Sequence, residues 1–254
     1  MSPSWNLPAV IAHRCGGALA PENSLAGLEI AAAMGIKGVE FDVQLSADGH
    51  PVVIHDDTLE RTAGRTGRVG DLRLDELLKC DIGAGHHRAF ADERLPALGD
   101  IARTCLRLGL VANVEIKCDE ADGPRVGGAV TQACCELWGG RTDRLVISSF
   151  SESALARAAE LAPHVGRALL VERIPDDWAQ RARALSCIAL HCSVASLSAA
   201  AVAEVRGCGF RIAGYTENDA TRAGDWFAAG VDALFTDRPD RLFGLGQAAP
   251  GALP

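Results

Sequence analysis

The stretch GVEFDV at residues 38–43 carries two acidic residues within a short apolar run. A run of this length, rich in β-branched and aromatic residues, is typical of a buried β-strand. Alternate residues of a strand point to the same side, so Glu40 and Asp42 project from one face. Two buried carboxylates on one face are unfavourable unless they are paired or bind a metal ion. The stretch therefore predicts both a core strand and a candidate site.

Similar apolar runs recur along the chain and predict eight buried strands. They lie at residues 9–13, 38–43, 110–116, 145–149, 167–171, 187–191, 210–214 and 232–236. Between them are longer stretches with helical spacing, many of which begin after Ser, Asp or Asn residues that can cap a helix. The clearest of these predicted helices span 24–34, 98–108, 125–138, 152–161, 176–185, 198–206 and 218–228.

Strict alternation of strands and helices favours parallel strands, hence the α/β class. Eight repeats within 254 residues predict a closed (β/α)₈ TIM barrel, which we expect to be a single domain over residues 1–254. The alternative is an open doubly wound sheet. The glycine pair Gly16-Gly17 in the first loop does not form the G-x-G-x-x-G pattern of that fold, so the barrel is favoured.

The interval after the second strand is much longer than one helix requires. Asp48-Gly49 predicts a turn, and residues 51–55 predict a short strand that folds back. Residues 56–96 are polar and rich in Gly and Arg, with one short helix near 74–79. An insertion at this place in a barrel is expected to lie over the top face and to shape the active site.

Composition excludes several classes of protein. Lys and Arg number 25 against 33 Asp and Glu, and the net charge of −8 argues against a nucleic-acid binder with a broad basic surface. No apolar run approaches the roughly 18 residues needed to span a membrane, and we expect no secretory signal. Nine cysteines without a C-x-x-C pair argue against a disulfide framework or a structural zinc site. We expect reduced thiols and a cytoplasmic protein.

Polar side chains gather at the predicted carboxyl ends of the first strands, where barrels carry their chemistry. The set consists of His13, Arg14, Glu40, Asp42, His55, Glu115 and Lys117. Three carboxylates favour a hard cation, Mg²⁺ or Ca²⁺, although ion pairs with Arg14 and Lys117 are the structural alternative. A cation with these two basic side chains would suit a phosphate group.

The histidines differ in how well their positions suit catalysis. His13 and His55 lie at neighbouring strand ends, where they suit general acid–base catalysis near neutral pH. His86 and His87 fall in the insertion, where we expect them to be solvated. His191 ends the sixth predicted strand, and the sequence leaves open whether it lines the pocket or belongs to the core.

Motifs in a fixed order resemble the glycerophosphodiester phosphodiesterases, in particular their short cytoplasmic bacterial form. The resemblance covers roughly residues 9–243, so it is more specific than any single motif. It rests on His13-Arg14, PENS at 21–24, VEFDV at 39–43, DG at 48–49, VVIHDDTLERT at 52–62, VEIK at 114–117, SSF at 148–150, YTEN at 215–218 and LFTDRP at 234–239.

This resemblance implies a metal-dependent barrel that hydrolyses glycerophosphodiesters, which are deacylated phospholipids, to glycerol 3-phosphate and an alcohol. It implies a site with one divalent cation and a small-molecule substrate, without nucleic acid or an integral membrane segment. It implies that Glu40, Asp42 and Glu115 bind the cation and that His13 and His55 are the acid–base pair. Arg14 and Lys117 are the implied phosphate ligands. Glu22 and Asn23 in the first loop support substrate binding, and Phe150 and Tyr215 form walls for glycerol.

Two residues depart from the family pattern. Cys15 stands where glycine is usual, and Tyr215 stands where tryptophan is frequent. The Cys15 thiol could be activated by nearby positive charge or could merely fill space, and the sequence leaves both readings open. Two other functions are also open: a Schiff-base lyase of the aldolase type using Lys117, and a barrel that binds phosphodiesters without cleaving them.

Overall fold

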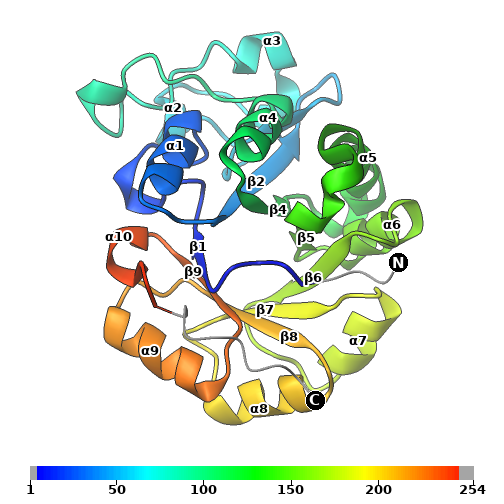
Figure 1. The fold of residues 1–254 in the computed structure, drawn as a ribbon. Coiled ribbons are helices and arrows are strands. Elements are labelled where there is room, and N and C mark those ends of the chain that lie inside the picture. Colours follow the sequence, from blue (N-terminus) through cyan, green and yellow to red (C-terminus); the bar gives the residue numbers. More distant parts are fainter. Residues whose placement is uncertain (1–4, 246–254) are drawn as a thin grey trace.

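The computed structural model describes residues 5–245 and shows a closed barrel of parallel strands surrounded by helices (Figure 1). The strand order is β1-β9-β8-β7-β6-β5-β4-β2-β3, and β1 also pairs with β2, which closes the ring. β3 runs antiparallel to β2 and lies outside the ring of eight parallel strands. The predicted (β/α)₈ barrel is confirmed.

Strand boundaries fall within two residues of the predicted ones for the eight barrel strands. The strands are β1 (Val10–Ala12), β2 (Gly38–Leu45), β3 (Pro51–Val53), β4 (Val111–Ile116), β5 (Leu145–Ser149), β6 (Gly166–Val171), β7 (Ala189–Ser193), β8 (Arg211–Tyr215) and β9 (Ala233–Thr236). The shift is largest for β7, which places His191 in the middle of the strand instead of at its end. That shift changes how deep in the barrel His191 lies, whereas the alternation of the strand's faces is unaffected.

Helices occupy the predicted intervals and often begin at the expected caps. The Ser24 hydroxyl accepts a hydrogen bond from the Gly27 N–H, and α4 ends at Gly109 with a φ of 68°. None of the helices in the described part of the chain is long and apolar enough to cross a membrane. The α-helices are α1 (Leu25–Ala33), α2 (Glu60–Ala63), α3 (Leu74–Leu77), α4 (Leu98–Leu108), α5 (Gly123–Trp138), α6 (Glu152–Leu161), α7 (Trp178–Ala184), α8 (Ala199–Gly207), α9 (Ala220–Ala229) and α10 (Pro239–Leu242). The 3₁₀ helices are η1 (Gly17–Leu19), η2 (Val69–Asp71), η3 (Arg88–Phe90), η4 (Glu120–Asp122) and η5 (Gly139–Arg144).

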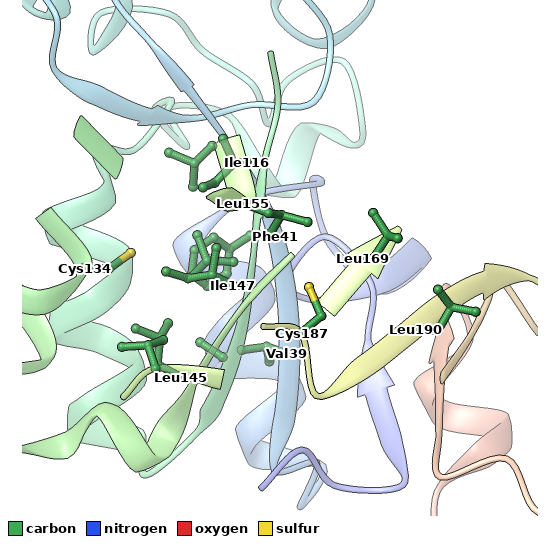
Figure 2. Close-up of a cluster of buried hydrophobic side chains, with 14 of the residues drawn as sticks. Val39, Phe41, Ile116, Cys134, Leu145, Ile147, Leu155, Leu169, Cys187 and Leu190 are labelled. Atoms are coloured by element: carbon green, nitrogen blue, oxygen red, sulfur yellow. The ribbon is translucent and has the colours of Figure 1, made fainter. Parts of the chain in front are cut away.

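The main hydrophobic core lies between the strands and the surrounding helices. Figure 2 shows part of it, with Phe41 of β2 and Ile147 of β5 near side chains of α5 and α6. Both strand residues are fully buried, as are Cys134 of α5 and Leu155 of α6. The apolar faces of the strands therefore point outward, and their other faces line the inside of the barrel.

A buried cluster inside the barrel contains several small residues. Alanines on four neighbouring strands form an interior cluster with Leu7 and Phe235, and Trp5 packs against the same cluster. Alanine fills little volume, so larger polar side chains can point into the barrel above this layer. These alanines are Ala168, Ala189, Ala213 and Ala233.

The interval after β2 folds back as predicted and then forms a compact insertion. Val43 of β2 pairs with Val53 of β3. In the view of Figure 1 the cyan segment with α2 and α3 lies on the α1 and α4 side of the ring. The insertion buries a small core of its own, and His86 and His87 are exposed as expected. The members of that core include Leu59, Val69, Leu77, Cys80, Ile82 and Leu95.

Candidate active site

Three carboxylates meet inside the mouth of the barrel. Glu40 and Asp42 come from β2 and Glu115 comes from β4, where Asp42 and Glu115 are directly opposite in the sheet register. One oxygen of each lies within 4.8 Å of the others. The Glu40 and Asp42 residues are only 2% and 1% exposed, so this cluster is almost completely removed from solvent.

The charges of this cluster repel one another in the absence of a partner. Burial, and then the nearby charge of Asp42, raise the pKa of Glu40 to about 8 and that of Glu115 to about 7. Glu40 Oε1 is buried and has no hydrogen-bond partner among residues 5–245. All the possible ligand atoms are carboxylate oxygens, which suit a hard divalent cation. Such a cation would offset the repulsion between the carboxylates and give Glu40 Oε1 a partner.

Two basic side chains flank the carboxylates. Arg14 Nε lies 3.9 Å and Lys117 Nζ lies 3.7 Å from the oxygens of Asp42. Lys117 Nζ is also 3.2 Å from Glu115. Burial lowers the pKa of Lys117, but the charges of Glu115 and Asp42 outweigh it and leave the pKa raised. A Schiff base requires a neutral amine, so these ion pairs argue against the lyase alternative.

His13 follows β1 and is oriented by a carboxylate from the end of the barrel. Its Nδ1 lies 2.6 Å from Asp237 Oδ1, and because a carboxylate can only accept, Nδ1 donates. Its Nε2 is 3.8 Å from Glu40. Burial lowers the pKa of His13, but the hydrogen bond to Asp237 and the charge of Glu40 raise it above its usual value. Asn218 Nδ2 donates to Asp237 at 3.2 Å and holds it in place.

His55 has the same arrangement on the other side of the cluster. Its Nδ1 lies 2.7 Å from Asp56 Oδ1, and its Nε2 lies 3.2 Å from Lys117 Nζ. Each histidine therefore has a carboxylate behind it and directs Nε2 toward the centre. Asp237 and Asp56 both lie in the quoted motifs, but their orienting role was missed because the two pairs form only in the folded barrel.

Arg61 joins the insertion to the first loop through two carboxylates. Its guanidinium donates to Asp56 at 2.6 and 2.8 Å and to Glu22 at 2.5 and 2.8 Å. Glu22 in turn accepts a bond from Arg14 at 3.1 Å. Burial would raise the pKa of Glu22, but these guanidinium contacts lower it. One side chain thus helps to orient both His55, through Asp56, and Arg14, through Glu22.

Replacing Arg61 by alanine should lower kcat roughly 10- to 100-fold, because small misplacements of catalytic groups are costly. Added guanidinium ion should restore part of kcat if the defect is the loss of the Arg61 guanidinium that bridges Asp56 and Glu22 (the Arg61 clamp). Arg88→Ala provides the control, because Arg88 is an exposed arginine of the same insertion. An Arg61→Ala enzyme with parental kcat would show that the clamp is not needed for positioning.

The first loop has an unusual backbone that presents its polar groups. Arg14, Cys15 and Asn23 have φ values of 49°, 74° and 57°, in the left-handed region. Such conformations concentrate at functional sites. The Asn23 amide donates to Asp42 at 2.9 Å and its oxygen accepts from the Asp42 N–H at 3.2 Å. Glu22 and Asn23 therefore contact other protein side chains of the site.

Cys15 fills space beneath the site. The residue is 0% exposed and belongs to the main hydrophobic core. Burial, followed by the neighbouring Cys105 and Glu40, raises the pKa of its thiol well above the usual value. Burial and the nearby acidic groups therefore favour the reading in which Cys15 fills space over the one in which its thiol is activated.

We expect Cys15→Gly to retain hydrolytic activity and to change stability by no more than about 1 kcal/mol. Glycine relieves the left-handed backbone, while the loss of a small buried side chain costs a similar amount. Mass spectrometry of native protein treated with iodoacetamide should find exposed Cys208 modified and Cys15 unmodified. Rapid labelling of Cys15 would contradict its buried position.

Two hollows meet at the carboxylate cluster. An open groove of about 300 Å³ is lined by Lys117, by Asp57 and Arg68 of the insertion, and by residues of α5. A smaller cavity of about 40 Å³ lies inside the barrel. Glu115 and Phe150 line both, so the cluster lies where the groove and the cavity join.

Two aromatic side chains form a wall of the cavity. The rings of Phe150 and Tyr215 pack edge to face, with centroids 6.2 Å apart and planes at 87°. The Tyr215 hydroxyl donates to the Val171 carbonyl at 2.9 Å. The hydroxyl is therefore bonded to the backbone, and the ring of Tyr215 lines the cavity.

Comparisons with known proteins agree with this geometry. A family model described as the glycerophosphoryl diester phosphodiesterase family matches residues 13–241. A glycerophosphodiester phosphodiesterase from Caldanaerobacter subterraneus subsp. tengcongensis is 32% identical over 93% of this chain and 96% of its own. An Oleispira antarctica phosphodiesterase, solved with the product sn-glycerol-3-phosphate, has a TM-score of 0.87 and 34% identity over 93% of this chain and 95% of its own. An Agrobacterium tumefaciens glycerophosphodiester phosphodiesterase has a TM-score of 0.75 and 26% identity, covering 93% of this chain and 99% of that one.

Proposed function

We propose a mechanism for this enzyme from one premise: the chain belongs to the glycerophosphoryl diester phosphodiesterase family. Membership supports hydrolysis of glycerophosphodiesters to glycerol 3-phosphate and an alcohol. The Oleispira antarctica structure, which holds sn-glycerol-3-phosphate, supports the same product for this chain. The alternative of a non-catalytic barrel required the loss of a metal ligand or a histidine, and the expected ones are all present.

Glu40, Asp42 and Glu115 would hold one divalent cation, Mg²⁺ or Ca²⁺. When bound, the cation polarises a phosphate oxygen and offsets charge that develops during phosphoryl transfer. Arg14 and Lys117 bind the remaining phosphate charge. Arg14 Nε is buried without a hydrogen-bond partner in the described chain, so it is available to a phosphate oxygen.

The two histidines serve opposite sides of the phosphorus. His13 lines the enclosed cavity, whereas Nε2 of His55 contacts Lys117, which lines the open groove. Attacking and leaving oxygens lie roughly in line during phosphoryl transfer. We therefore assign His13 to deprotonation of the attacking oxygen and His55 to protonation of the alcohol that leaves through the groove.

The charges around His13 are compatible with that role. The charge of Glu40 is one cause of the raised pKa of His13. A cation held by Glu40 would offset this charge and favour neutral His13, as a general base requires. On the other side, His55 Nε2 lies beside Lys117 at the open groove, and its side chain is 30% exposed, so His55 can take up from water the proton that a general acid must donate.

The observation that carries the proposal is the joint placement of the carboxylate cluster, two oriented histidines and two basic side chains at one barrel mouth. The insertion lines the groove, so we propose that barrel and insertion act as one functional unit. Release of glycerol 3-phosphate from glycerophosphocholine, with and without EDTA, tests the proposal. Release of phosphocholine instead would show that the other ester bond is cleaved, and activity unaffected by EDTA would contradict the role of the cation.

A further inference from the structure

Gln44 lies next to the catalytic groups but has no part in the steps above. It follows Glu40 and Asp42 at alternate positions of β2, so its side chain points to the same face as theirs. The residue is only 8% exposed, and it lines the open groove. A polar side chain buried at this place needs hydrogen-bond partners, and the partners that it has indicate its role.

The Gln44 amide lies against three consecutive backbone carbonyls. Its Nε2 lies 3.1, 3.0 and 2.9 Å from the oxygens of Ile54, His55 and Asp56. A carbonyl oxygen only accepts, so the donating NH₂ end of the amide must face them. An NH₂ group carries two hydrogens, so at least one of them is shared between two carbonyls. The chain therefore curls around this one group at residues 54–56.

These carbonyls belong to the segment that carries His55. β3 ends at Val53, and the Ile54 N–H then donates to the Asp42 carbonyl at 3.0 Å. Beyond that bond the chain leaves the sheet and enters the insertion. The bond between His55 Nδ1 and Asp56 joins adjacent residues, so it orients the ring relative to its own backbone but does not fix that backbone to the barrel.

We propose that Gln44 is a positioning residue that holds the main chain of His55 against β2 and so keeps His55 Nε2 directed at the site. The inference rests on the proposed function and adds a residue on which the geometry of its acid–base pair depends. The role differs from that of the Arg61 clamp, which acts on the side chain of Asp56 from the insertion. Gln44 acts on the main chain from a barrel strand, so it sets the position from which the His55 ring extends.

Loss of the amide donor should displace His55 while the rest of the site stays in place. Carbonyls that lose their donor in a partly buried place are unfavourable, so the segment should shift until water reaches them. Small displacements of a catalytic group are costly to kcat. Glu40 and Asp42 are held by the pairing of β2 with β4, so their positions should not change. We therefore expect a lower kcat with little change in KM.

A double-mutant cycle tests the inference. Gln44→Met keeps the length of the side chain but cannot donate, and it should lower kcat for glycerophosphocholine roughly 10- to 100-fold. In the His55→Ala background the same substitution should lower kcat much less, because the residue through which it acts is already gone. In the His13→Ala background it should keep its full effect. Gln132→Met is the matched control, since Gln132 is exposed on α5 and its loss should leave kcat unchanged.

The outcomes separate this inference from the proposed function. Parental kcat for Gln44→Met, or an equal loss of kcat in the parent enzyme and in both histidine variants, overturns the positioning role while the proposed function stands. Failure of the parent enzyme to release glycerol 3-phosphate contradicts the proposed function directly, before any variant is made.

A second substitution covers the case in which Gln44→Met folds poorly. Gln44→His then repeats the cycle, because its ring keeps one N–H donor where the amide has two. Its smaller loss of kcat should again disappear in the His55→Ala background. A loss of the same size in the His13→Ala and His55→Ala backgrounds overturns the inference.

Discussion

His55→Ala and His13→Ala are each expected to lower kcat for glycerophosphocholine by about 10² to 10⁴-fold, the usual contribution of general acid–base groups. The side chains of His13 and His55 are 20% and 30% exposed, so their loss should leave the fold nearly as stable as the parent. Circular dichroism and thermal melting of each variant check that point. A variant with parental kcat would remove that histidine from the mechanism.

A nitrophenyl phosphodiester of glycerol separates the two roles. Nitrophenolate is a good leaving group and needs little protonation, so His55→Ala should recover much of its lost rate with this substrate. His13→Ala should stay slow, because the attacking oxygen still needs a base. Greater recovery by His13→Ala than by His55→Ala would reverse our assignment, and equal recovery would contradict any division of roles.

Much of the fold and the cation cluster could be predicted because they depend on short periods in the sequence. A period of two places Glu40 with Asp42 on one face of a predicted strand. The alternation of strands and helices then brings β2 and β4 together, since parallel neighbours in a closed barrel follow chain order. These statements need no knowledge of long-range side-chain contacts.

Other parts of the site depend on contacts between distant segments. The pair formed by His13 and Asp237 joins residues 224 positions apart, and Arg61 reaches Glu22 over 39 positions. No local pattern identifies such partners. His191 shows a second limit: the sequence left open whether it lines the pocket or belongs to the core, and only the fold shows that it is fully buried and lines the enclosed cavity. For Cys15, neighbouring positive charge suggested reactivity, but only the fold reveals its burial.

Divalent cation should stabilise the folded protein, and Glu115→Gln should abolish that effect together with most activity. A cation at a hundredfold excess over Kd contributes about 2.7 kcal/mol. For a chain of this length that corresponds to a rise in Tm of roughly 5–10 °C. Glu160→Gln is the matched control, because the Glu160 side chain is 67% exposed on α6. An equal rise in Tm for Glu115→Gln would exclude Glu115 as a ligand.

The pH dependence of the metal-free protein gives an independent test of the same cluster. Folding raises the pKa of Glu40 from 4.5 to about 8 and that of Glu115 from 4.5 to about 7. Between these limits the native state holds more protons than the unfolded state, so the free energy of unfolding falls as pH rises from about 4.5 to about 8. Cation binding should suppress this fall, because the charged carboxylates then have a partner, and Glu115→Gln should reduce it. Urea titrations in EDTA across this pH range would measure the fall in the free energy of unfolding. A metal-free protein that gains stability toward pH 8 would contradict the mutual repulsion of these carboxylates.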